Sequence, residues 1–520
     1  MYYHREPREV PVDIIAYWAA QQPSRPAVID GERVATWAEF RDRRNRLAHA
    51  LSDRALGKGE HVVIYAENSQ EYLLTVVAAR ALGAVAIPMN HRLTTEEAAY
   101  ILDNSDAVAA FVSDAFVPMA ERLRAGAPRV RHWILMGRER RPWALHLDDL
   151  VAAGRPAPRE AIAGQGLGAS MIYTAGTTGK PKGALRGAID PAAIVERFRA
   201  LDLAVPDHIH LVAGPLYHSA PIGFALYSQI FGATLVVMHK FDPEQALALI
   251  ARHHCTSTFM APTLVKRLVE LPAEVLRRYD VSSLRVIVVA GAPCPMQVKE
   301  DVVRVLGPVL YEFYGSTELG INTVLRPEDA LRKPGSCGRA APGTELAILD
   351  DAGQPVPPGN PGTLYVRRTL GVFDGYYKND AATRETIRGE WLTVGDVAWI
   401  DAEGFVYVCD RKRDMIISGG VNIYPAEIED VLHRHPAILD AAVFGVPDDE
   451  WGERVHAAVQ LRSGHTLSVQ EVRDFARRHL ADYKIPRDVS FVENFPRDTA
   501  GKLVKRVLRE PYWRGRATRV

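Results

Sequence analysis

Apolar positions along the chain follow two patterns: short apolar runs typical of buried strands, and longer stretches with one apolar face typical of helices. In the first third the two alternate, with a helix predicted at 69–82 between strands at 61–65 and 84–88. Helices are also predicted at 14–20 and 37–51, and strands at 107–112, 133–136, 171–173, 234–238, 257–260 and 284–290. This strand–helix–strand order predicts an α/β protein with layered sheets.

The pattern changes near residue 334. Short strands separated by turns, at 346–349, 362–366, 391–393, 397–400 and 405–409, predict a small β-barrel-like subdomain over about 334–410. Residues 415–510 then show strands and helices mixed in a unit of ordinary domain size. We therefore predict a large N-terminal domain, 1–410, and a small α+β C-terminal domain, 414–520.

Composition and charge narrow the class of protein. Lys+Arg and Asp+Glu both number 63, so the zero net charge gives no overall attraction to nucleic acid or to an anionic membrane. The 4 cysteines are scattered without paired spacing, which indicates reduced thiols and a cytoplasmic protein. No apolar run approaches the roughly 18 residues of a spanning helix, and the N-terminus lacks a signal-peptide core.

A glycine- and threonine-rich turn follows the predicted strand at 171–173. It reads Thr174-Ala175-Gly176-Thr177-Thr178-Gly179-Lys180-Pro181, and its backbone N–H groups and hydroxyls suit an anion. It is not a Walker A loop, because Pro181 stands where that motif has Ser or Thr. A polar surface turn with solvated lysines is the alternative interpretation.

A second candidate segment, Glu312-Phe313-Tyr314-Gly315-Ser316-Thr317-Glu318, ends a predicted strand. Tyr314 can stack on a purine, Gly315 allows close approach of the ring, and Thr317 can donate to a phosphate oxygen. Glu318 is a hard oxygen ligand suited to Mg²⁺. A strand with a glycine turn is the structural alternative.

Together these segments resemble two motifs of the adenylate-forming superfamily, which includes acyl-CoA synthetases, peptide-synthetase adenylation domains and luciferases. Five motifs in order extend the resemblance over essentially the whole chain. The turn Gly291-Ala292-Pro293 lies at the C-terminal end of a predicted strand, where open α/β sheets bind ligands, and we assign it to ATP or AMP as well. The resemblance implies that ATP or AMP binds the first segment, Glu312 to Gly315 and Thr317, with Asp396 as a ribose contact and Arg411 as a ribose or phosphate contact. It also places His218, Gly291 and Gly315 beside the acyl group, although a lone histidine is more often structural.

The resemblance assigns the C-terminal residues as well. Lys502 matches the catalytic lysine that bridges the carboxylate and the α-phosphate, and Ser418, Gly419 and Gly420 match a strand that faces pantetheine. Residues 411–413 match the interdomain hinge, with Arg413 where Asp or Lys is common, and Ile417 replaces a frequent lysine. Lys505 and the basic tail are interpreted as solvated.

The resemblance implies an enzyme that uses ATP and Mg²⁺ to convert a carboxylic acid into an acyl-adenylate with release of pyrophosphate. The catalytic set is Lys502, Thr177, Glu318 and His218, with Glu318 as the metal ligand. The second step transfers the acyl group to the thiol of coenzyme A. A free-standing amide ligase and a non-catalytic acyl or nucleotide sensor are the two rivals. The acid is not predicted, and a homodimer is the default assembly.

Overall fold

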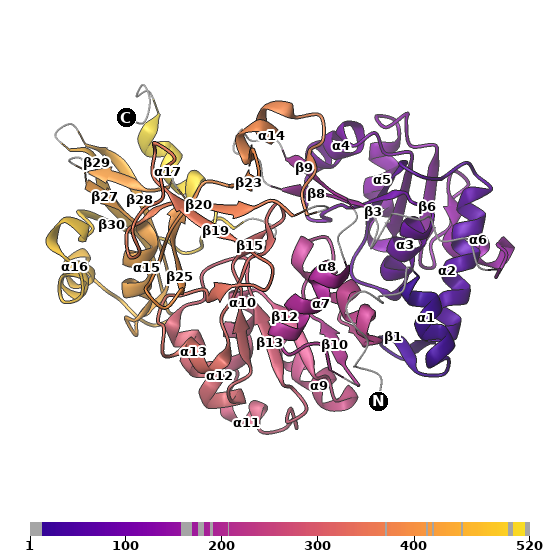
Figure 1. The fold of residues 1–520 in the computed structure, drawn as a ribbon, viewed down its shortest axis with the longest axis horizontal. Coiled ribbons are helices and arrows are strands. Elements are labelled where there is room, and N and C mark those ends of the chain that lie inside the picture. The colour runs from indigo at the N-terminus through magenta and orange to yellow at the C-terminus, as the bar shows by residue number, and fades with distance from the viewer. Residues whose placement is uncertain are drawn as a thin grey trace.

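The computed structural model describes residues 13–157, 169–174, 181–187, 191–205, 207–369, 372–411, 414–418, 421–448, 451–497 and 503–514. The N-terminal part, indigo to orange in Figure 1, contains two large sheets, and the C-terminal part contains a smaller one at the opposite end of the molecule. Layered α/β sheets with a separate α+β domain confirm the predicted fold class.

One large sheet has the strand order β14-β13-β12-β10-β11-β1-β2. Its strands run parallel except at the β1–β2 pair. The strands are β1 (Pro26–Asp30), β2 (Arg33–Thr36), β10 (Ile209–Val212), β11 (Thr234–Val237), β12 (Ser257–Met260), β13 (Val286–Val289) and β14 (Leu310–Glu312). The four residues of β11, β12 and β13 are all buried, which explains their unbroken apolar or hydroxyl character.

The other large sheet has the order β21-β9-β8-β4-β3-β5-β6-β7. Its strands are β3 (His61–Tyr65), β4 (Val85–Pro88), β5 (Ala109–Ser113), β6 (His132–Met136), β7 (Leu145–His146), β8 (Ser170–Thr174), β9 (Lys182–Arg186) and β21 (Gly375–Tyr376). Here β8 and β9 form an antiparallel hairpin in which Thr174 faces Lys182 and Ser170 faces Arg186. The Thr174 end of this hairpin contributes to the site described below.

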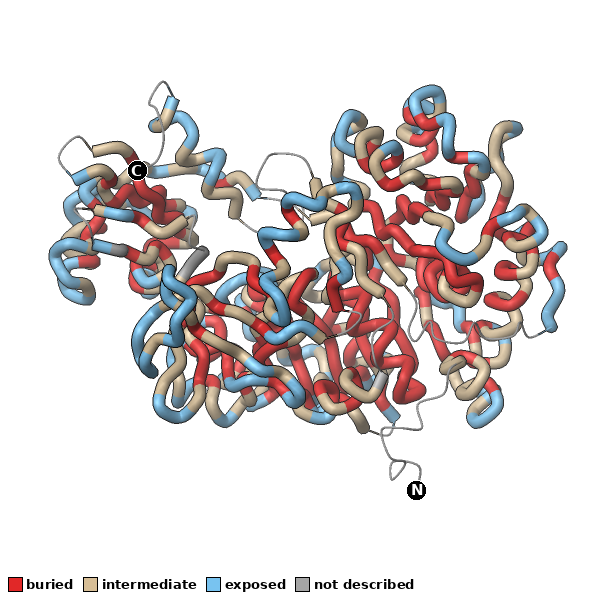
Figure 2. Tube along the Cα trace, turned by 45° about the horizontal axis from the view of Figure 1, so that its top comes forward, coloured by how far each residue is buried: buried red, intermediate tan, exposed pale blue. Residues whose placement is uncertain are grey.

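Helices cover these sheets, and the buried residues, red in Figure 2, follow the sheet strands and the helix faces packed on them. They are α1 (Ile14–Gln21), α2 (Trp37–Ser52), α3 (Gln70–Ala81), α4 (Thr95–Asn104), α5 (Val117–Arg124), α6 (Leu147–Ala153), α7 (Pro191–Ala200), α8 (Ser219–Ser228), α9 (Pro243–His253), α10 (Pro262–Val269), α11 (Ala273–Leu276), α12 (Met296–Leu306), α13 (Pro327–Ala330) and α14 (Asp380–Thr386), with 3₁₀ turns η2 (Asp114–Phe116) and η3 (Gln229–Phe231). Capping boxes begin α2 at Thr36 with Glu39 and α4 at Thr94 with Glu97.

The β-rich region is an antiparallel sheet of order β22-β23-β20-β24-β25, with β19 paired to β20. Its strands are β19 (Leu346–Leu349), β20 (Gly362–Arg367), β22 (Ile387–Arg388), β23 (Trp391–Leu392), β24 (Asp396–Ile400) and β25 (Val406–Arg411). Two short ladders connect it to the large sheets: β15 (Gly315–Ser316) with β16 (Gly320–Ile321), and β17 (Thr323–Val324) with β18 (Arg339–Ala340). Arg411 belongs to β25, so the first residue of the predicted hinge is a strand residue.

The C-terminal unit has the sheet order β27-β26-β29-β28, with β30 paired to β29. It comprises β26 (Ile416–Ser418), β27 (Val421–Ile423), β28 (Ile438–Asp448), β29 (Gly452–Leu461), β30 (Asp488–Phe491), α15 (Pro425–His433), α16 (Val469–Arg477), η4 (Asp482–Lys484) and α17 (Lys505–Trp513). The solvated interpretation of Lys505 is wrong: its ammonium lies 2.8 Å from the Glu429 carboxylate, and both side chains are largely covered. Helix α17 packs on β28 and brings this lysine to its partner.

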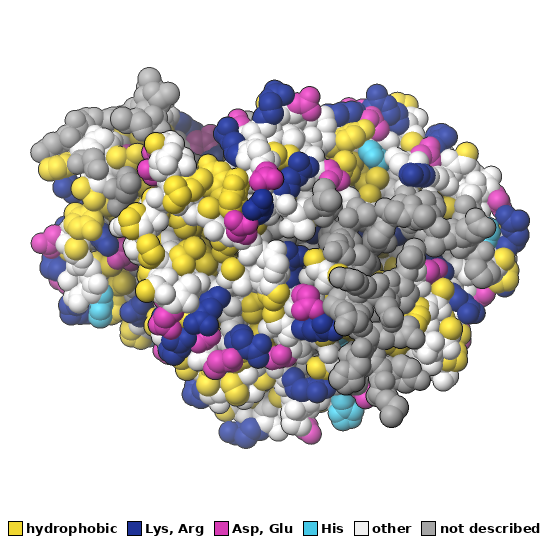
Figure 3. All heavy atoms as spheres, in the orientation of Figure 1, with side chains coloured by type: hydrophobic (Ala, Val, Ile, Leu, Met, Phe, Trp, Pro, Cys, Tyr) yellow, Lys and Arg dark blue, Asp and Glu magenta, His cyan; other side chains and the backbone are white. Residues whose placement is uncertain are grey.

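Several global expectations can be compared with the structure. Among the described residues no helix is long and apolar enough to cross a membrane. Cys255, Cys294 and Cys337 are free thiols, as predicted. On the face shown in Figure 3, basic and acidic side chains are mixed, which agrees with the balanced net charge.

Candidate nucleotide and acyl site

Glu318 occupies the centre of the site, where the β15–β16 hairpin meets the β8–β9 hairpin. Its side chain is buried, at 6% exposure, and its neighbours are hydroxyl groups. The Tyr376 hydroxyl donates to Oε1 at 2.8 Å, the Thr174 hydroxyl to the same oxygen at 3.4 Å, and the Ser316 hydroxyl to Oε2 at 2.9 Å. No cationic side chain pairs with this carboxylate among the described residues. A buried negative charge is thus held in place by neutral donors.

Magnesium fits this arrangement. A carboxylate accepts about four hydrogen bonds or metal contacts, so three hydroxyl donors leave room for a cation. The described part of the chain contains no cluster of three or more His, Cys, Asp or Glu that would form a complete metal cage. One carboxylate plus substrate phosphates is the usual protein arrangement for Mg²⁺. Glu318 would hold the ion, and the ion would neutralise phosphate charge.

The two residues assigned to ribose and purine are directly bonded. The Tyr314 hydroxyl donates to Asp396 Oδ2 at 2.6 Å, and Asp396 is buried at the start of β24. The strand register places Asp396 opposite Arg411, the other predicted ribose contact. Gly395, at φ +79°, provides the left-handed turn that leads into β24. Asp396 therefore joins Tyr314, 82 residues away in the sequence, to the strand pair that contains Arg411.

Gly315 has a structural requirement that the sequence did not reveal. A Cβ at this position would lie 1.9 Å from the Gly320 carbonyl oxygen, so only glycine lets the β15–β16 hairpin close. The hairpin in turn positions Ser316, Thr317 and Glu318.

Thr317 connects the hairpin to helix α8. Its hydroxyl donates to the Ser219 hydroxyl at 3.0 Å, and Ser219 is the first residue of the helix. His218 is the N-cap residue in extended conformation, with its ring 4.4 Å from that of Tyr217. The predicted acyl-side residue therefore lies next to the helix end that Thr317 contacts.

Two predicted nucleotide-site residues direct their side chains elsewhere. The Glu312 carboxylate lies 2.5 Å from the Lys299 ammonium, and Lys299 is 1% exposed. Burial lowers the pKa of Lys299, but the attraction of Glu312 outweighs it, so the net pKa is raised and the ammonium stays charged. Phe313 packs its ring against Phe224 and Phe259 in the core. Only the backbone of these two residues is left to face a ligand.

The turn Gly291-Ala292-Pro293 follows β13, at the carboxyl end of the parallel sheet. All three residues are exposed, and Gly291 has φ +91°. Ligands of open α/β sheets bind at this edge. The turn is therefore available, as the assignment requires.

In the C-terminal unit Ser418 ends β26, opposite Val421 of β27 and Gly452 of β29. Ile417 is 37% exposed, and its backbone N–H donates to Glu453. Contacts to the large domain are made by Lys266 with the Leu439 carbonyl at 3.0 Å and by Arg462 with Glu270 at 3.4 Å. The remaining assigned residues lie outside the described residues: Ala175, Gly176, Thr177, Thr178, Gly179, Lys180, Arg413, Gly419, Gly420 and Lys502.

Sequence reasoning missed Tyr376, Ser219 and the role of Ser316. Tyr376 is 58 residues from Glu318, and Ser219 is 98 residues from Thr317. A tyrosine after a glycine and a serine at a helix start carry no local sign of such contacts.

Comparisons with known proteins agree with this geometry. Residues 15–377 match the family model of the AMP-binding enzyme, and residues 427–502 match the AMP-binding enzyme C-terminal domain. The chain is 31% identical to the fatty acid–[acyl-carrier-protein] ligase ScoC of Streptomyces coeruleorubidus, covering 99% of each chain. It is 34% identical to the indoleacetate–CoA ligase of Aromatoleum aromaticum, covering 95% of this chain and 96% of that protein.

Solved structures extend the comparison. The anthranilate CoA ligase AuaEII in complex with anthranoyl-AMP superimposes with TM-score 0.89 at 26% identity, covering 98% of this chain and 99% of that one. The amide bond synthetase McbA of Marinactinospora thermotolerans gives TM-score 0.86 at 28% identity, covering 96% and 100%.

The fold and the site define an adenylate-forming enzyme. The chain belongs to the AMP-binding enzyme family, and it is an ATP-dependent, AMP-forming acid–thiol ligase with Mg²⁺ as the companion of ATP.

Proposed function

We propose that the chain activates a carboxylic acid as its acyl-adenylate at the Glu318 site and then transfers the acyl group to the thiol of coenzyme A. The observation that carries this proposal is the buried Glu318, held by hydroxyl donors beside the Tyr314–Asp396 pair. Such a site suits a magnesium-bound triphosphate whose ribose lies against Asp396. Adenylation needs it because two anions, carboxylate and ATP, must meet.

The site residues that the structure describes have separate roles in this reaction. Asp396 accepts the ribose hydroxyls, and Tyr314 fixes its orientation through the 2.6 Å hydrogen bond. The hydroxyls of Thr174 and Thr317, which donate to Glu318 and Ser219 in the ligand-free chain, turn to phosphate oxygens when ATP binds. The exposed Gly291 turn bounds the purine and acyl groups. His218 lies beside the reacting carboxylate, at the N-terminus of α8.

Adenylation and thioester formation use different faces of the C-terminal unit. Lys502 bridges carboxylate and α-phosphate as pyrophosphate leaves. The unit then rotates about residues 411–413, so that Ser418, Gly419 and Gly420 face the incoming thiol. The carboxyl carbon bonds to the sulfur, the bond to the AMP oxygen breaks, and the thiol proton goes to solvent.

Replacement of Lys502 tests the assignment. The Lys502→Ala variant is expected to lose acid-dependent pyrophosphate release by roughly 10²-fold or more, because a charge that stabilises the transition state is removed. It should still convert supplied acyl-adenylate and CoA to thioester. Lys240→Ala, on the exposed loop after β11, is the matched control. Equal losses in both half-reactions would contradict the division of roles.

An amide ligase is the second candidate, because McbA shares the fold over 96% of this chain. Product mass separates the two: incubation with CoA and with a panel of primary amines should give only the thioester. Amide formation at a higher rate than thioester would favour the second candidate.

We also propose a cytoplasmic, homodimeric enzyme. The free cysteines suit a reducing compartment, and twofold dimers are the commonest closed assembly. Light scattering of the purified chain tests the assembly, and a mass near 57.5 kDa would show a monomer instead.

A further inference from the structure

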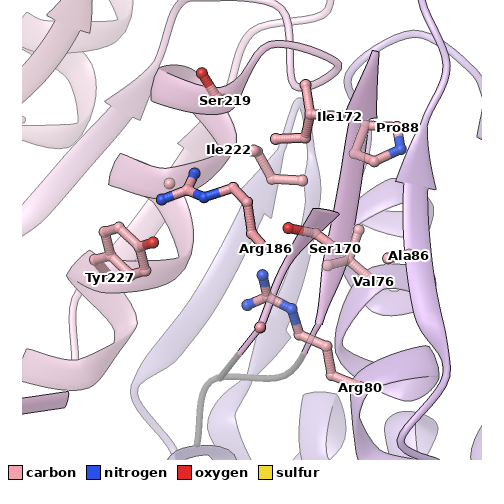
Figure 4. Close-up of a pocket in the computed structure, with 12 residues that line it drawn as sticks. Val76, Arg80, Ala86, Pro88, Ser170, Ile172, Arg186, Ser219, Ile222 and Tyr227 are labelled. Atoms are coloured by element: carbon pink, nitrogen blue, oxygen red, sulfur yellow. The ribbon is translucent and has the colours of Figure 1, made fainter. Parts of the chain in front are cut away.

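A small cavity lies between helix α8 and the β8–β9 hairpin (Figure 4). Its volume is about 20 Å³, room for a group of a few atoms but not for an acyl chain or a nucleotide. Two arginine side chains reach it, Arg80 from the last turn of α3 and Arg186 from the end of β9. Ser170, Ser219 and Tyr227 supply hydroxyl groups to the lining.

Arg80 has no ionic partner in the described part of the chain. Its Nε is buried without a hydrogen bond. Burial lowers its pKa to about 10, Tyr227 opposes this shift, and the charge of Arg186 adds to it. At neutral pH the guanidinium therefore remains charged beside a second cation.

Arg186 is equally short of negative charge. Its side chain donates from Nε to the Val372 carbonyl at 3.3 Å, and the strand register places it opposite Ser170. Asp374 lies against Gly187 at the cavity edge, yet no ion pair between Asp374 and either arginine exists among the described contacts. No acidic side chain of the described residues lines the cavity that the two guanidinium groups face.

Arg80 and Arg186 are each partly buried, and a charge that loses part of its hydration is normally paired with an opposite charge. Lys299 shows the ordinary solution in this same molecule, with Glu312 at 2.5 Å. Two neighbouring arginines without such a partner are suited to bind an anionic group of a ligand. A guanidinium offers a fork of donors that fits a carboxylate.

The cavity adjoins the reaction site. Ser219 lines it and also accepts the hydrogen bond of Thr317, and Ile172 of the lining precedes Thr174 on strand β8. Another face of α8 is filled: Phe224 stacks on Phe198 and Phe259, with ring centroids 5.4 and 5.1 Å apart. Space for the far end of a substrate therefore lies on the arginine side of the helix.

We propose that the Arg80–Arg186 cavity binds a second carboxylate of the acid substrate, so that the preferred substrate class is a dicarboxylic acid. This inference rests on the proposed adenylation of a carboxylic acid, whose reacting carboxylate lies beside Thr317 and His218. The far carboxylate accepts hydrogen bonds from both guanidinium groups, and the distance between the two sites selects one chain length.

The test compares α,ω-dicarboxylic acids of increasing length with their monomethyl esters, in which only the far carboxylate is masked. With the full chain and Mg-ATP, exchange of labelled pyrophosphate into ATP is measured. At the best length kcat/KM for the diacid should exceed that for its ester by about tenfold or more. Arg80→Met and Arg186→Met should each reduce this ratio to near one, and Arg80→Lys should retain part of it. Arg304→Met, an exposed residue of α12 paired with Asp301, should leave the ratio unchanged.

A binding measurement without turnover accompanies the assay. The diacid of best length should raise the unfolding temperature of the wild type and not that of Arg80→Met, whereas inorganic phosphate should raise neither. Exchange with monoacids or esters and no diacid preference would overturn the inference alone. Stabilisation by phosphate equal to that by diacid would also overturn it and assign the cavity to a free anion. No exchange with any acid would overturn the proposed function as well.

Discussion

Glu318 and Arg80 are both charged side chains without a salt-bridge partner among the described residues, one negative and one positive. Glu318 is a buried carboxylate ringed by the hydroxyls of Tyr376, Thr174 and Ser316. Arg80 is a guanidinium with a buried Nε, beside Arg186 in a cavity. Neither residue forms a salt bridge among the described residues, in contrast to the buried pair of Lys299 and Glu312.

This difference shows where ligands belong. A complete pair such as Lys299–Glu312 serves the fold and needs nothing further. The carboxylate of Glu318 suits a cation that comes with ATP, and the arginines suit an anion. Both regions contact the segment around Thr317 and Ser219, so their ligands are brought to one place. An unpaired side-chain charge therefore indicates a ligand group of the opposite charge.

The largest effect is expected from Glu318→Gln, which removes the charge but keeps the shape. Loss of the metal carboxylate should lower acid-dependent pyrophosphate exchange by roughly 10²–10³-fold, because Mg²⁺ no longer neutralises the phosphates in place. The exchange rate is measured over a range of Mg²⁺ concentrations. Glu345→Gln, on the exposed side of the β-rich region, is the control. Equal exchange in both variants would remove Glu318 from the site.

Breaking the complete pair should damage the fold instead. Lys299→Met leaves the Glu312 carboxylate buried without a partner, a change that costs about 3–5 kcal/mol. The urea midpoint of the large domain should fall, and Lys299→Met with Glu312→Leu should recover part of the loss. A single variant as stable as wild type would show that the pair is not structural.

Replacement of Arg80, which has no salt-bridge partner among the described residues, should stabilise the fold instead. Arg80→Met removes a charge that has no ionic partner in the described part of the chain, so the ligand-free protein should gain about 1–2 kcal/mol of unfolding free energy. Urea unfolding without any acid measures this gain, with Arg304→Met as the exposed control. Destabilisation of Arg80→Met alone would indicate a structural partner for the guanidinium.

The ion pair of exposed His239 with buried Asp30 should show the smallest effect on stability. The hydrogen bond to Asp30 outweighs desolvation and raises the pKa of His239, whose side chain is 57% exposed. Burial raises the pKa of Asp30, but His239 and the Gln70 amide more than offset this and lower it overall. The contribution of His239 is therefore complete below the unfolded pKa of 6.5 and is lost as pH rises through the folded value. Wild type and His239→Gln should differ by less than about 1 kcal/mol near pH 6 and converge by about pH 9. A difference that grows with pH would contradict this sign.

Local patterns were sufficient for most of the secondary structure. Strands β3 and β4 and helix α3 lie where the apolar runs predicted them. The residues of a buried strand or of the buried face of a helix are close in sequence, so their apolar pattern can be recognised locally. Strands β1 and β2 were missed, since segments of five and four residues around a turn give too short a pattern. Helix α17 was missed because its polar sequence gains stability from packing on β28 and from the Lys505–Glu429 pair.

The site was predictable only in part. The motif around Glu318 and the position of Asp396 could be identified because their residue types are contiguous or sit in a recognisable turn. The Tyr376 contact to Glu318, the burial of Glu312 against Lys299 and the meeting of Arg80 with Arg186 all depend on tertiary pairing. No one segment carries a signal for such pairs.

Single-turnover analysis of the two half-reactions separates formation of the acyl-adenylate from formation of the thioester. The purified chain is mixed with Mg-ATP and a diacid panel without CoA, and the bound product is identified by mass after quenching. Adenylation followed by thioester formation should give about one pyrophosphate released per site, a bound acyl-adenylate, and its conversion to acyl-CoA and AMP when CoA is added. Thioester formed without an adenylate, or no pyrophosphate with any acid, would contradict this two-step reaction.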